Sequence, residues 1–422
     1  MIPKERDESM TRRVVVTGVG TINPLGHRVE DTWENLKNGV SGVGPITLIE
    51  TGDLLVKIAC EVKEFDPGDY INAKVARRID RYQQFAKVAT QEALAQSGFE
   101  VGEEDPSRVG VVVSTAVGGM TTLDEGMKVL FTDGPRRLNP FFIPKFMPNG
   151  AASLIGIDIG AQGPSFSVAS ACASGADSIG LGRQMIQAGV IDACIAGSSE
   201  ATITRIGVSS FDRLGALSRR NDDYSMTPAP FDRNRDGLVM GEGAGILVLE
   251  SLERAKARGA EILGEIVGHG STSDAFHITA PSEQGHGGAA AISIAMDQAG
   301  LNPEDLHYIN AHGTATQLND IAETYAIKKA LGDPAYRVPI SSTKSMTGHM
   351  MGATGAVEAI ICLLVIRDNV IPPTIHFSEA DPECDLDYVP NAAREQMVST
   401  AISNAFGFGG HNGVLAFRAF SD

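Results

Sequence analysis

A cysteine at a strand-to-helix junction is the clearest candidate for chemistry in this 422-residue sequence. Cys172 ends an apolar, extended run that starts at Ser167, and a helix-like segment containing Ile179 and Ile186 follows it. The first N–H groups of a helix have no intrahelical partner, so they can hold a developing oxyanion. The helix dipole there also predicts a lowered thiol pKa. The alternative is a buried structural cysteine, because free cysteines pack well in protein cores.

Three further motifs offer polar side chains and flexible backbone to such a nucleophile. They are NAHGTAT at residues 310–316 with His312, KSMTGH at 344–349 with Lys344 and His349, and NAFGFGG at 404–410. Each alone has a structural explanation, such as a hydrogen-bonded histidine in a turn, and the glycine loop does not match a phosphate-binding P-loop. Two histidines and a cysteine are also potential zinc ligands. Their wide separation, without a compact ligand motif, argues against zinc.

These motifs must be positioned by strands that alternate with helices. The pattern predicts strands near residues 13–20, 109–115, 193–197, 245–249, 262–268, 307–311, 338–342, 401–403 and 413–418. It predicts helices near residues 32–38, 74–97, 173–190, 287–300, 320–331 and 353–367, with an irregular segment at 134–150 and turns at 212–245. Such alternation is typical of an α/β fold whose sheets are covered by helices.

A short internal repeat accompanies this alternation. ASGA at residues 173–176 recurs 180 residues later as ATGA at 353–356, and each copy opens a helix-like segment. Four small residues can coincide by chance, but the matched strands around them favour an internal duplication. Two similar halves would set two helix N-termini opposite each other about a pseudo-dyad. His349 would then face Cys172.

Composition limits the class of protein and its surroundings. Hydrophobic residues at 43% and charged residues at 21% describe a soluble globular protein. The apolar run at residues 359–366 is far shorter than the ~20 residues that cross a bilayer. Residues 1–11 are charged, lack the apolar core of a signal peptide and predict a disordered tail, in which Met10 is an alternative start.

Cysteine usage and net charge limit the cellular compartment and the classes of binding partner. The five cysteines are scattered without CxxC spacing, which indicates a reducing compartment and predicts a cytoplasmic location. A formal charge of −17 disfavours nucleic acids and anionic membranes as general partners. It leaves room for an acidic protein that docks on a local basic patch.

Taken together, the motifs resemble the condensing enzymes of fatty-acid synthesis, the β-ketoacyl-[acyl-carrier-protein] synthases, with type II as the closest match. The resemblance runs from about Arg13 to Phe417 and includes DRNRDG at residues 232–237 and GEGAG at 241–245. It implies a thiolase-like fold with two similar α/β halves in five α-β-α-β-α layers, usually as a homodimer. We expect residues 12–260 to carry the cysteine and residues 261–422 to carry both histidines.

The resemblance also implies a mechanism. Cys172 would take an acyl chain from acyl carrier protein as a thioester, since a thiolate both attacks and leaves well. His312 and His349 would donate Nε2–H groups to the enolate formed when malonyl-carrier protein loses CO₂. Backbone N–H groups of Cys172 and Phe408 would form a second oxyanion hole. No metal or organic cofactor is expected.

Supporting roles are implied in the same way. Lys344 would organise His312 and the local field, with Glu358 as the buried carboxylate behind it and Phe408 as the gate between the two half-reactions. The remaining implied residues are Phe406 in support of the site, Thr314 and Thr316 for phosphopantetheine, Val117 and Phe211 for the acyl tunnel, and Lys74, Arg77, Arg78, Arg136 and Arg137 for carrier-protein docking. The alternative for the basic cluster is a solvated helix face.

Some positions depart from the pattern of the resemblance. His411 and Thr354 stand where many relatives have Thr and Ala, and Gln317 and Gly215 also differ from commoner choices. None belongs to the Cys-His-His set, so the preferred acyl length is the least secure inference. Two alternatives stay open: a stand-alone type II polyketide ketosynthase, and a non-catalytic chain-length partner, which typically lacks the cysteine.

Overall fold

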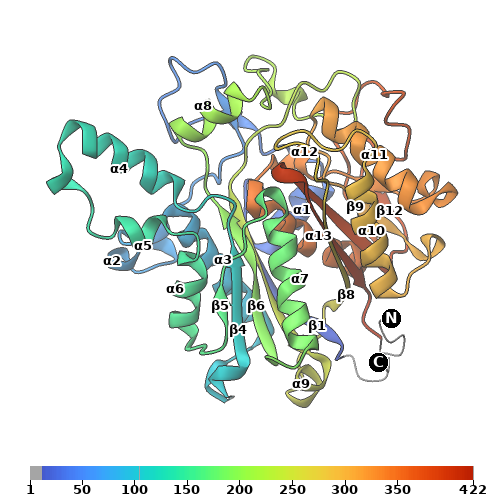
Figure 1. The fold of residues 1–422 in the computed structure, drawn as a ribbon, viewed down its shortest axis with the longest axis horizontal. Helices are drawn as coiled ribbons and strands as arrows, with labels where there is room; N and C mark the ends of the chain where they lie inside the picture. Colours follow the sequence, from blue (N-terminus) through green and yellow to red (C-terminus); the bar gives the residue numbers. More distant parts are fainter. Residues whose placement is uncertain (1–11, 104, 422) are drawn as a thin grey trace.

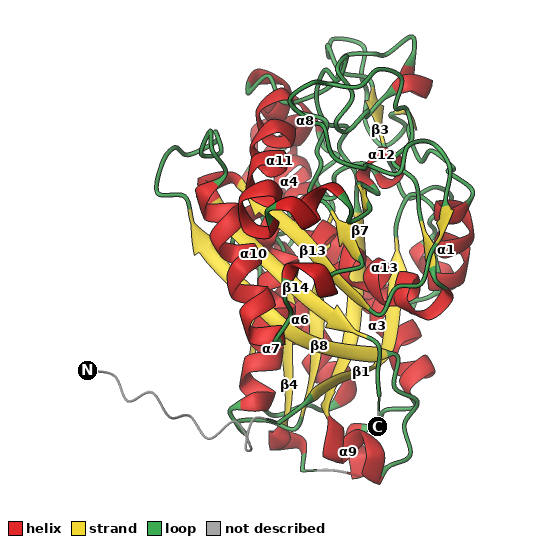
Figure 2. Ribbon diagram, turned by 90° about the vertical axis from the view of Figure 1, so that its right-hand side faces the viewer, coloured by secondary structure: helices red, strands yellow, loops and turns green. Residues whose placement is uncertain are grey.

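A computed structural model describes residues 12–103 and 105–421, and a ten-stranded mixed sheet runs through its centre (Figure 1 and Figure 2). The tail expected at residues 1–11 lies outside the described residues. One half of the sheet contains β1 (Val14–Ile22), β4 (Val109–Ser114), β5 (Ser165–Phe166), β6 (Ala193–Glu200) and β7 (Gly243–Ser251). The other contains β8 (Gly264–Ser273), β9 (Tyr308–Asn310), β10 (Ile340–Ser341), β13 (Thr400–Gly407) and β14 (His411–Arg418).

The two halves of the sheet share one pairing pattern. In the first half β7 pairs antiparallel with β1 and β6, and β4 pairs parallel with β6 and β5. In the second half β14 pairs antiparallel with β8 and β13, and β9 pairs parallel with β13 and β10. A short antiparallel pairing of β1 with β8 joins them. This is the arrangement expected of a duplicated α/β unit.

Helices form three layers around the two half-sheets, which confirms the five-layer prediction. The middle layer is α7 (Ser174–Gln187) and α13 (Thr354–Asp368); the outer layers are α3 (Arg81–Ser97) with α6 (Gly150–Ile159), and α10 (His286–Ala299) with α11 (Gln317–Leu331). The other α-helices are α1 (Val29–Lys37), α2 (Ala73–Ala76), α4 (Met120–Thr132), α5 (Phe142–Phe146), α8 (Arg205–Arg213), α9 (Leu252–Ala257) and α12 (Lys344–Thr347). Two short ladders join β2 (Gly44–Pro45) to β3 (Ile58–Ala59) and β11 (Val370–Ile371) to β12 (Arg394–Glu395).

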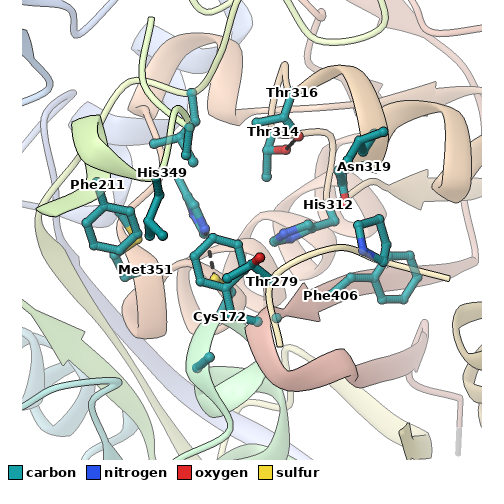
Figure 3. A pocket seen from close by; sticks show the side chains of 18 of the residues that line it. Cys172, Phe211, Thr279, His312, Thr314, Thr316, Asn319, His349, Met351 and Phe406 are labelled. Carbon is teal, nitrogen blue, oxygen red and sulfur yellow. Dashed lines mark hydrogen bonds between the residues drawn. The ribbon is translucent and has the colours of Figure 1, made fainter. Parts of the chain in front are cut away.

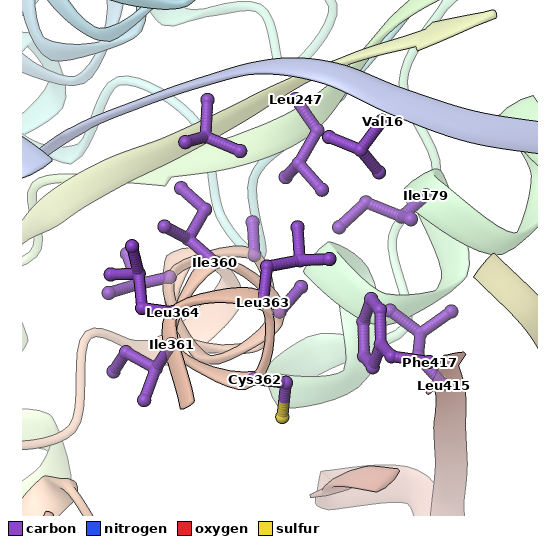
Figure 4. Packing of buried hydrophobic residues seen from close by; sticks show 14 of the residues in the cluster. Val16, Ile179, Leu247, Ile360, Ile361, Cys362, Leu363, Leu364, Leu415 and Phe417 are labelled. Carbon is purple, nitrogen blue, oxygen red and sulfur yellow. The ribbon is translucent and has the colours of Figure 1, made fainter. Parts of the chain in front are cut away.

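The helix α13 lies at the centre of the largest apolar cluster. Every residue from Thr354 to Ile366 is buried, which is expected of a helix that is covered on all sides. Figure 4 shows Ile360 and Leu363 of this helix beside Leu247 of β7, with Phe417 of β14 nearby. The core therefore belongs to both halves. No helix among the described residues is long and apolar enough to cross a membrane.

The ASGA and ATGA repeat marks the crossing of the two middle helices. A Cβ on Gly175 would lie 2.6 Å from the backbone N of Ala356, and a Cβ on Gly355 would lie 2.9 Å from the backbone N of Ala176. Glycine is required at both positions because the two backbones touch. The residues that precede the helices correspond as well: Ala171 and Met351, 180 positions apart, have φ of +50° and +46°. The repeat thus builds two matching turns on one pseudo-dyad.

The helix expected at residues 74–97 is two helices, so that prediction is wrong. The first, α2, ends at Ala76, and α3 begins at Arg81. Asp80 starts the second helix with a capping box, since its side chain accepts the N–H of Tyr82 and its own N–H donates to Gln83. The apolar spacing runs across the break and hides it.

Other helices were missed by the sequence pattern. The segment expected to be irregular at residues 134–150 contains α5 and leads into α6, and α4 and α8 were not predicted. Only Thr122 of α4 is buried, so this helix makes little contact with the core. Gly150 and Gly156 lie within α6, where glycine opposes helix formation.

Candidate active site

Cys172 lies in a 3₁₀ turn that leads directly into α7 (Figure 3). Ala171 in this turn has the left-handed φ noted above, a conformation that costs free energy and needs support from its surroundings. Ser174 provides it: its Oγ accepts the N–H of Ser170 at 3.0 Å and donates to the carbonyl of Ala171 at 2.7 Å. The nucleophile candidate is therefore held by the first residue of its own helix.

His349 approaches Cys172 from the other half of the molecule. Its Nε2 lies 3.1 Å from the Sγ atom of Cys172. The backbone N–H of His349 donates to Val239, and its carbonyl accepts from Gly241, both at 2.8 Å. The GEGAG motif that begins at Gly241 thus anchors the histidine loop, and the structure brings the two residues together as the pseudo-dyad implied.

His312 follows β9 and is held by a buried carboxylate. Glu323 accepts the backbone N–H groups of His312 and Gly313, each at 2.7 Å. The rings of His312 and His349 meet edge to face, with centroids 5.3 Å apart and planes at 86°. One nitrogen of each ring and the Cys172 Sγ lie within 4.8 Å of one another. Phe406 packs beside His312, with centroids 6.0 Å apart.

Both histidines are neutral in these surroundings. Burial lowers the pKa of His312 and of His349 well below the usual value, and the positive charge of Lys344 lowers each further. A neutral imidazole has one N–H donor and one lone pair. Each ring can therefore present a hydrogen-bond donor to an oxygen atom that gains negative charge.

The expected lowering of the cysteine pKa is wrong. Burial raises the pKa of Cys172 to about 11, and the opposing effects of Lys344 and of the backbone N–H groups of Phe408 and Cys172 do not compensate. Desolvation of a thiolate outweighs the helix N-terminus here. At neutral pH the group is a thiol that must lose its proton when substrate is bound.

Lys344 and Glu358 form a buried ion pair behind the histidines. Their Nζ and Oε1 atoms are 2.7 Å apart, and both side chains are almost wholly inaccessible. Burial raises the pKa of Glu358 to about 7, although Lys344 opposes that shift. The lysine charge also acts on Cys172, His312 and His349, so it contributes to the field of the whole site.

The cysteine and two histidines are also the only set of three or more potential metal ligands found among residues 12–103 and 105–421. Three ligands with an open position is a pattern that catalytic zinc uses. The positive charge of Lys344, which disfavours protonation of both rings, equally opposes a bound cation.

The equivalent turn of the second half already holds a carboxyl oxygen. Gly352, 180 positions after Cys172, donates its N–H to Oε2 of Glu200 at 3.1 Å. The same oxygen accepts the N–H of Ala116 at 2.7 Å, and Thr115 donates to the other oxygen at 2.6 Å. The geometry of this turn therefore suits an anionic oxygen, and the matching N–H of Cys172 is placed to do the same for a substrate.

Glu200 predicts a pH dependence of stability. Burial raises its pKa from 4.5 to about 7, so ionisation costs more in the folded than in the unfolded chain. Its contribution is full below pH 4.5 and is lost as pH rises through 7. Between pH 5 and 7 we expect the wild type to lose on the order of 2 kcal/mol more unfolding free energy than Glu200→Gln. Chemical denaturation at both pH values measures this, and equal losses would contradict it.

A cavity of about 550 Å³ connects the predicted site residues (Figure 3). Phe211 and Phe408 stack at its wall, with centroids 6.3 Å apart, and Thr314 and Thr316 line it with hydroxyls 2.9 Å apart. The other predicted residues that line it are Val117, Phe406, Cys172, His312 and His349. Lys344 and Glu358 lie behind this lining.

The DRNRDG motif supports the threonine loop. Arg235 is fully buried, pairs with Asp320 at 3.5 Å, and donates to the carbonyl of Thr316 at 3.3 Å. Asp320 in turn accepts the N–H of Thr314 at 3.1 Å. A buried ion pair therefore holds the backbone of the two threonines, whose hydroxyls bond to each other.

The predicted basic cluster lies on the surface in two neighbouring segments. Lys74, Arg77 and Arg78 are exposed on or beside α2, and Arg136 and Arg137 are exposed after α4. The guanidinium of Arg78 stacks on the ring of Phe141 at 5.1 Å. This contact brings α2 to the segment that follows Arg137.

Sequence reasoning missed a polar network behind the nucleophile. Ser170 donates to Asp177 at 2.5 Å, and His269 of β8 lies 3.0 Å from the other oxygen of Asp177. The residue equivalent to Asp177 in the second half is the buried Val357. A comparison of the two repeats beyond four residues would have shown this polar position.

Two family models match the chain. The model for the N-terminal domain of beta-ketoacyl synthase matches residues 11–255, and the model for the C-terminal domain matches residues 263–378. A 3-oxoacyl-[acyl-carrier-protein] synthase 2 of Staphylococcus aureus (strain COL) is 48% identical over 412 residues, covering 98% of this chain and 99% of the relative.

Solved structures agree with this similarity. The ishigamide ketosynthase/chain length factor superposes with a TM-score of 0.91 at 36% identity, covering 97% of this chain and 100% of that one. A type II PKS acyl-carrier protein in complex with its ketosynthase bound to the hexaketide gives a TM-score of 0.89 at 34% identity, with the same coverage.

Proposed function

The chain belongs to the beta-ketoacyl synthase family, and on that premise we propose that it is an elongating β-ketoacyl-[acyl-carrier-protein] synthase of fatty-acid synthesis. The observation that carries the proposal is the cluster of Cys172, His312 and His349, whose reactive atoms lie within 4.8 Å of one another. A thiol and two neutral imidazoles are what a decarboxylative condensation of two thioesters needs.

The first step transfers the acyl chain. The sulfur of Cys172 attacks the carbonyl of acyl-carrier protein, and the backbone N–H groups of Cys172 and Phe408 hold the oxyanion. A carbon–sulfur bond to the enzyme forms while the bond to pantetheine breaks. The thiol proton leaves with the departing pantetheine sulfur, so free carrier protein is released.

The second step forms the carbon–carbon bond. The carboxylate of malonyl-carrier protein leaves as CO₂, and its bonding electrons pass to the thioester enolate. His312 and His349 donate N–H groups to the enolate oxygen, and burial together with the charge of Lys344 keeps both rings neutral. The α-carbon attacks the acyl-Cys172 carbonyl, and the cysteine sulfur leaves as a thiolate. This yields 3-oxoacyl-carrier protein, and the thiolate takes one proton from solvent to restore the thiol.

The cavity supports the assignment of substrate groups. Phe408 and Phe211 stack at its wall, so a turn of Phe408 would open the way to an acyl pocket that includes Val117. The paired hydroxyls of Thr314 and Thr316 suit the amide groups of phosphopantetheine. We propose no metal or organic cofactor, because loss of CO₂ drives the step.

The specialised alternative is a type II polyketide ketosynthase, since one similar structure is described as a type II PKS acyl-carrier protein with its ketosynthase and another as a ketosynthase/chain length factor. Those structures are 36% and 34% identical to this chain, whereas the synthase 2 relative is 48% identical. The greater similarity favours fatty-acid elongation. A non-catalytic chain-length partner is disfavoured because Cys172 and both histidines are present and in contact.

Intact-mass analysis tests the proposal on enzyme treated with a chelator. Incubation with long-chain acyl-carrier protein should add one acyl group, and proteolytic mapping should find it on Cys172. Malonyl-carrier protein should then discharge the adduct as a 3-oxoacyl product two carbons longer. Absence of an adduct with any acyl length would overturn the proposal, and loss of activity only after chelation would overturn the metal-free mechanism.

The acidic carrier protein is proposed to dock on the basic cluster. A solved relative was described with an acyl-carrier protein bound to its ketosynthase. We expect Lys74→Glu with Arg136→Glu to raise KM for carrier-bound substrate about ten-fold at low salt with kcat unchanged, because the charges steer association. Steady-state kinetics measure this. Arg337→Glu, an exposed site on the other half, is the control, and an equal rise there would contradict specific docking.

A homodimer is proposed because one end of the sheet is uncovered. β5 is the last strand of the sheet order, and Ile157, on the neighbouring helix α6, is 77% exposed. Phe131 on α4, farther from β5, is 79% exposed. Pairing of β5 with a second copy would satisfy the free edge and cover these side chains. Sedimentation should give twice the 44.5 kDa chain mass; a stable monomer at micromolar concentration would contradict this.

The cytoplasm is the proposed location. All five cysteines are free and buried, and the proposed nucleophile needs a reduced thiol. Determination of the redox state of Cys172 in intact cells tests this, since persistent oxidation would contradict it.

A further inference from the structure

Thr354 is the first residue of α13, and its hydroxyl contacts the ring of His349. Its side chain is buried, and Oγ1 lies 3.1 Å from Nδ1 of His349. Within residues 12–103 and 105–421 this is the only hydrogen bond of that hydroxyl.

The hydroxyl decides which ring nitrogen carries hydrogen. If the ring hydrogen is on Nε2, Nδ1 is a lone pair and accepts the Thr354 O–H, so both groups are satisfied. If the ring hydrogen is on Nδ1, it donates to Oγ1, and the buried hydroxyl hydrogen is left without an acceptor. An unsatisfied buried donor is costly enough to bias the ratio of the two tautomers about ten-fold or more.

We propose that Thr354 is a positioning residue that fixes His349 as the Nε2–H tautomer. Nε2 is the nitrogen 3.1 Å from the Cys172 sulfur, so it is the one that faces the reacting groups. The inference rests on the proposed function, in which this nitrogen must donate to the enolate oxygen of malonyl-carrier protein.

The two half-reactions depend differently on this tautomer. The enolate oxygen carries negative charge, so it needs a donor and is repelled by a lone pair. Acylation is served by either form, because Nε2–H donates to the cysteine thiolate and a bare Nε2 accepts the thiol hydrogen. Loss of the hydroxyl should therefore slow malonyl decarboxylation much more than acylation.

The other half of the molecule provides an internal comparison. The residue equivalent to Thr354 is Ser174, whose hydroxyl bonds to the backbone of Ser170 and Ala171. A hydroxyl at the start of the helix thus supports the nucleophile turn in one half. In the second half, the same position supports the histidine.

The test separates the half-reactions in Thr354→Val, which keeps the shape, and Thr354→Ser, which keeps the hydroxyl. Thr347→Val is the matched control, because Thr347 is buried two residues before His349 and its hydroxyl donates only to the backbone carbonyls of Thr343 and Gly348. For Thr354→Val we expect CO₂ release from malonyl-carrier protein to fall about ten-fold, with its KM and single-turnover acylation within about three-fold of wild type. Thr354→Ser and Thr347→Val should resemble wild type in both.

Ring nitrogen spectra of ¹⁵N-histidine-labelled enzyme give a readout that does not need activity. His349, assigned through His349→Gln, should be protonated at Nε2 in the wild type and lose that preference in Thr354→Val. Hydrogen on Nδ1 in the wild type would overturn the inference, as would equal losses in both half-reactions or in the serine variant. A wild type that takes no acyl chain yet shows Nε2–H would overturn the proposed function alone.

Discussion

Replacing Cys172 by alanine is expected to abolish condensation, with a fall of about 10⁵-fold or more in turnover. The acyl chain then has no covalent carrier, and no other thiol lies against the two histidines, because the remaining described cysteines are elsewhere in the core. Intact-mass analysis should show no adduct, and no product two carbons longer should form from acyl- and malonyl-carrier protein.

Cys194→Ala is the matched control for this variant. Cys194 is also a buried free cysteine, but it lies within β6, and burial raises its pKa to about 12. This control should keep one acyl adduct and wild-type turnover. An adduct that persisted in Cys172→Ala would show that the nucleophile is another residue.

Replacing His312 by alanine should lower condensation by about 10²–10³-fold, the usual cost of one lost donor to a developing oxyanion. The ring is neutral and stands edge to face with His349, so it can donate without first losing a proton. Acylation of Cys172 should stay within about three-fold of wild type, because His312 makes no hydrogen bond to the sulfur in the structure. Rapid-quench measurement of acylation and of CO₂ release separates the two steps.

His307→Ala controls for the loss of a histidine from the same segment. His307 lies just before β9, and its ring contacts Ser399 and Thr400 instead of the cavity. Its removal should leave both steps near wild type. A His312→Ala enzyme that lost acylation and decarboxylation equally would not support a role specific to the enolate.

The clustering of Cys172, His312 and His349 was predictable because these residues occur in short, distinctive motifs. Cys172, His312 and His349 come from segments far apart in the chain, but each follows a strand and precedes a turn or helix in one of two repeated halves. The repeat alone placed His349 opposite Cys172, and the structure puts these atoms 3.1 Å apart. The five-layer fold followed from the same motifs through family resemblance.

What was not predictable depends on three-dimensional surroundings. The position of Cys172 at the start of a helix suggested a low thiol pKa. Burial raises that pKa to about 11, and the depth of burial is not visible in the sequence. The break before Asp80 is hidden because apolar spacing continues across it. His349, the hydrogen-bond partner of Thr354, is only five residues away in the sequence. The bond forms because the turn between them brings the two side chains together, and the sequence does not show this.

The contact of Gly175 with Gly355 has a consequence for how the enzyme accommodates long substrates. The two halves touch backbone to backbone at this crossing and also share strand pairing between β1 and β8, so hinging them apart would break both contacts. We therefore expect no large domain closure, which many enzymes use to enclose a substrate. We expect adaptation to a growing chain to come from rotamer changes at residues such as Phe408 and from the loops at the cavity mouth, with little change in the 3.1 Å distance between the Cys172 sulfur and the His349 imidazole.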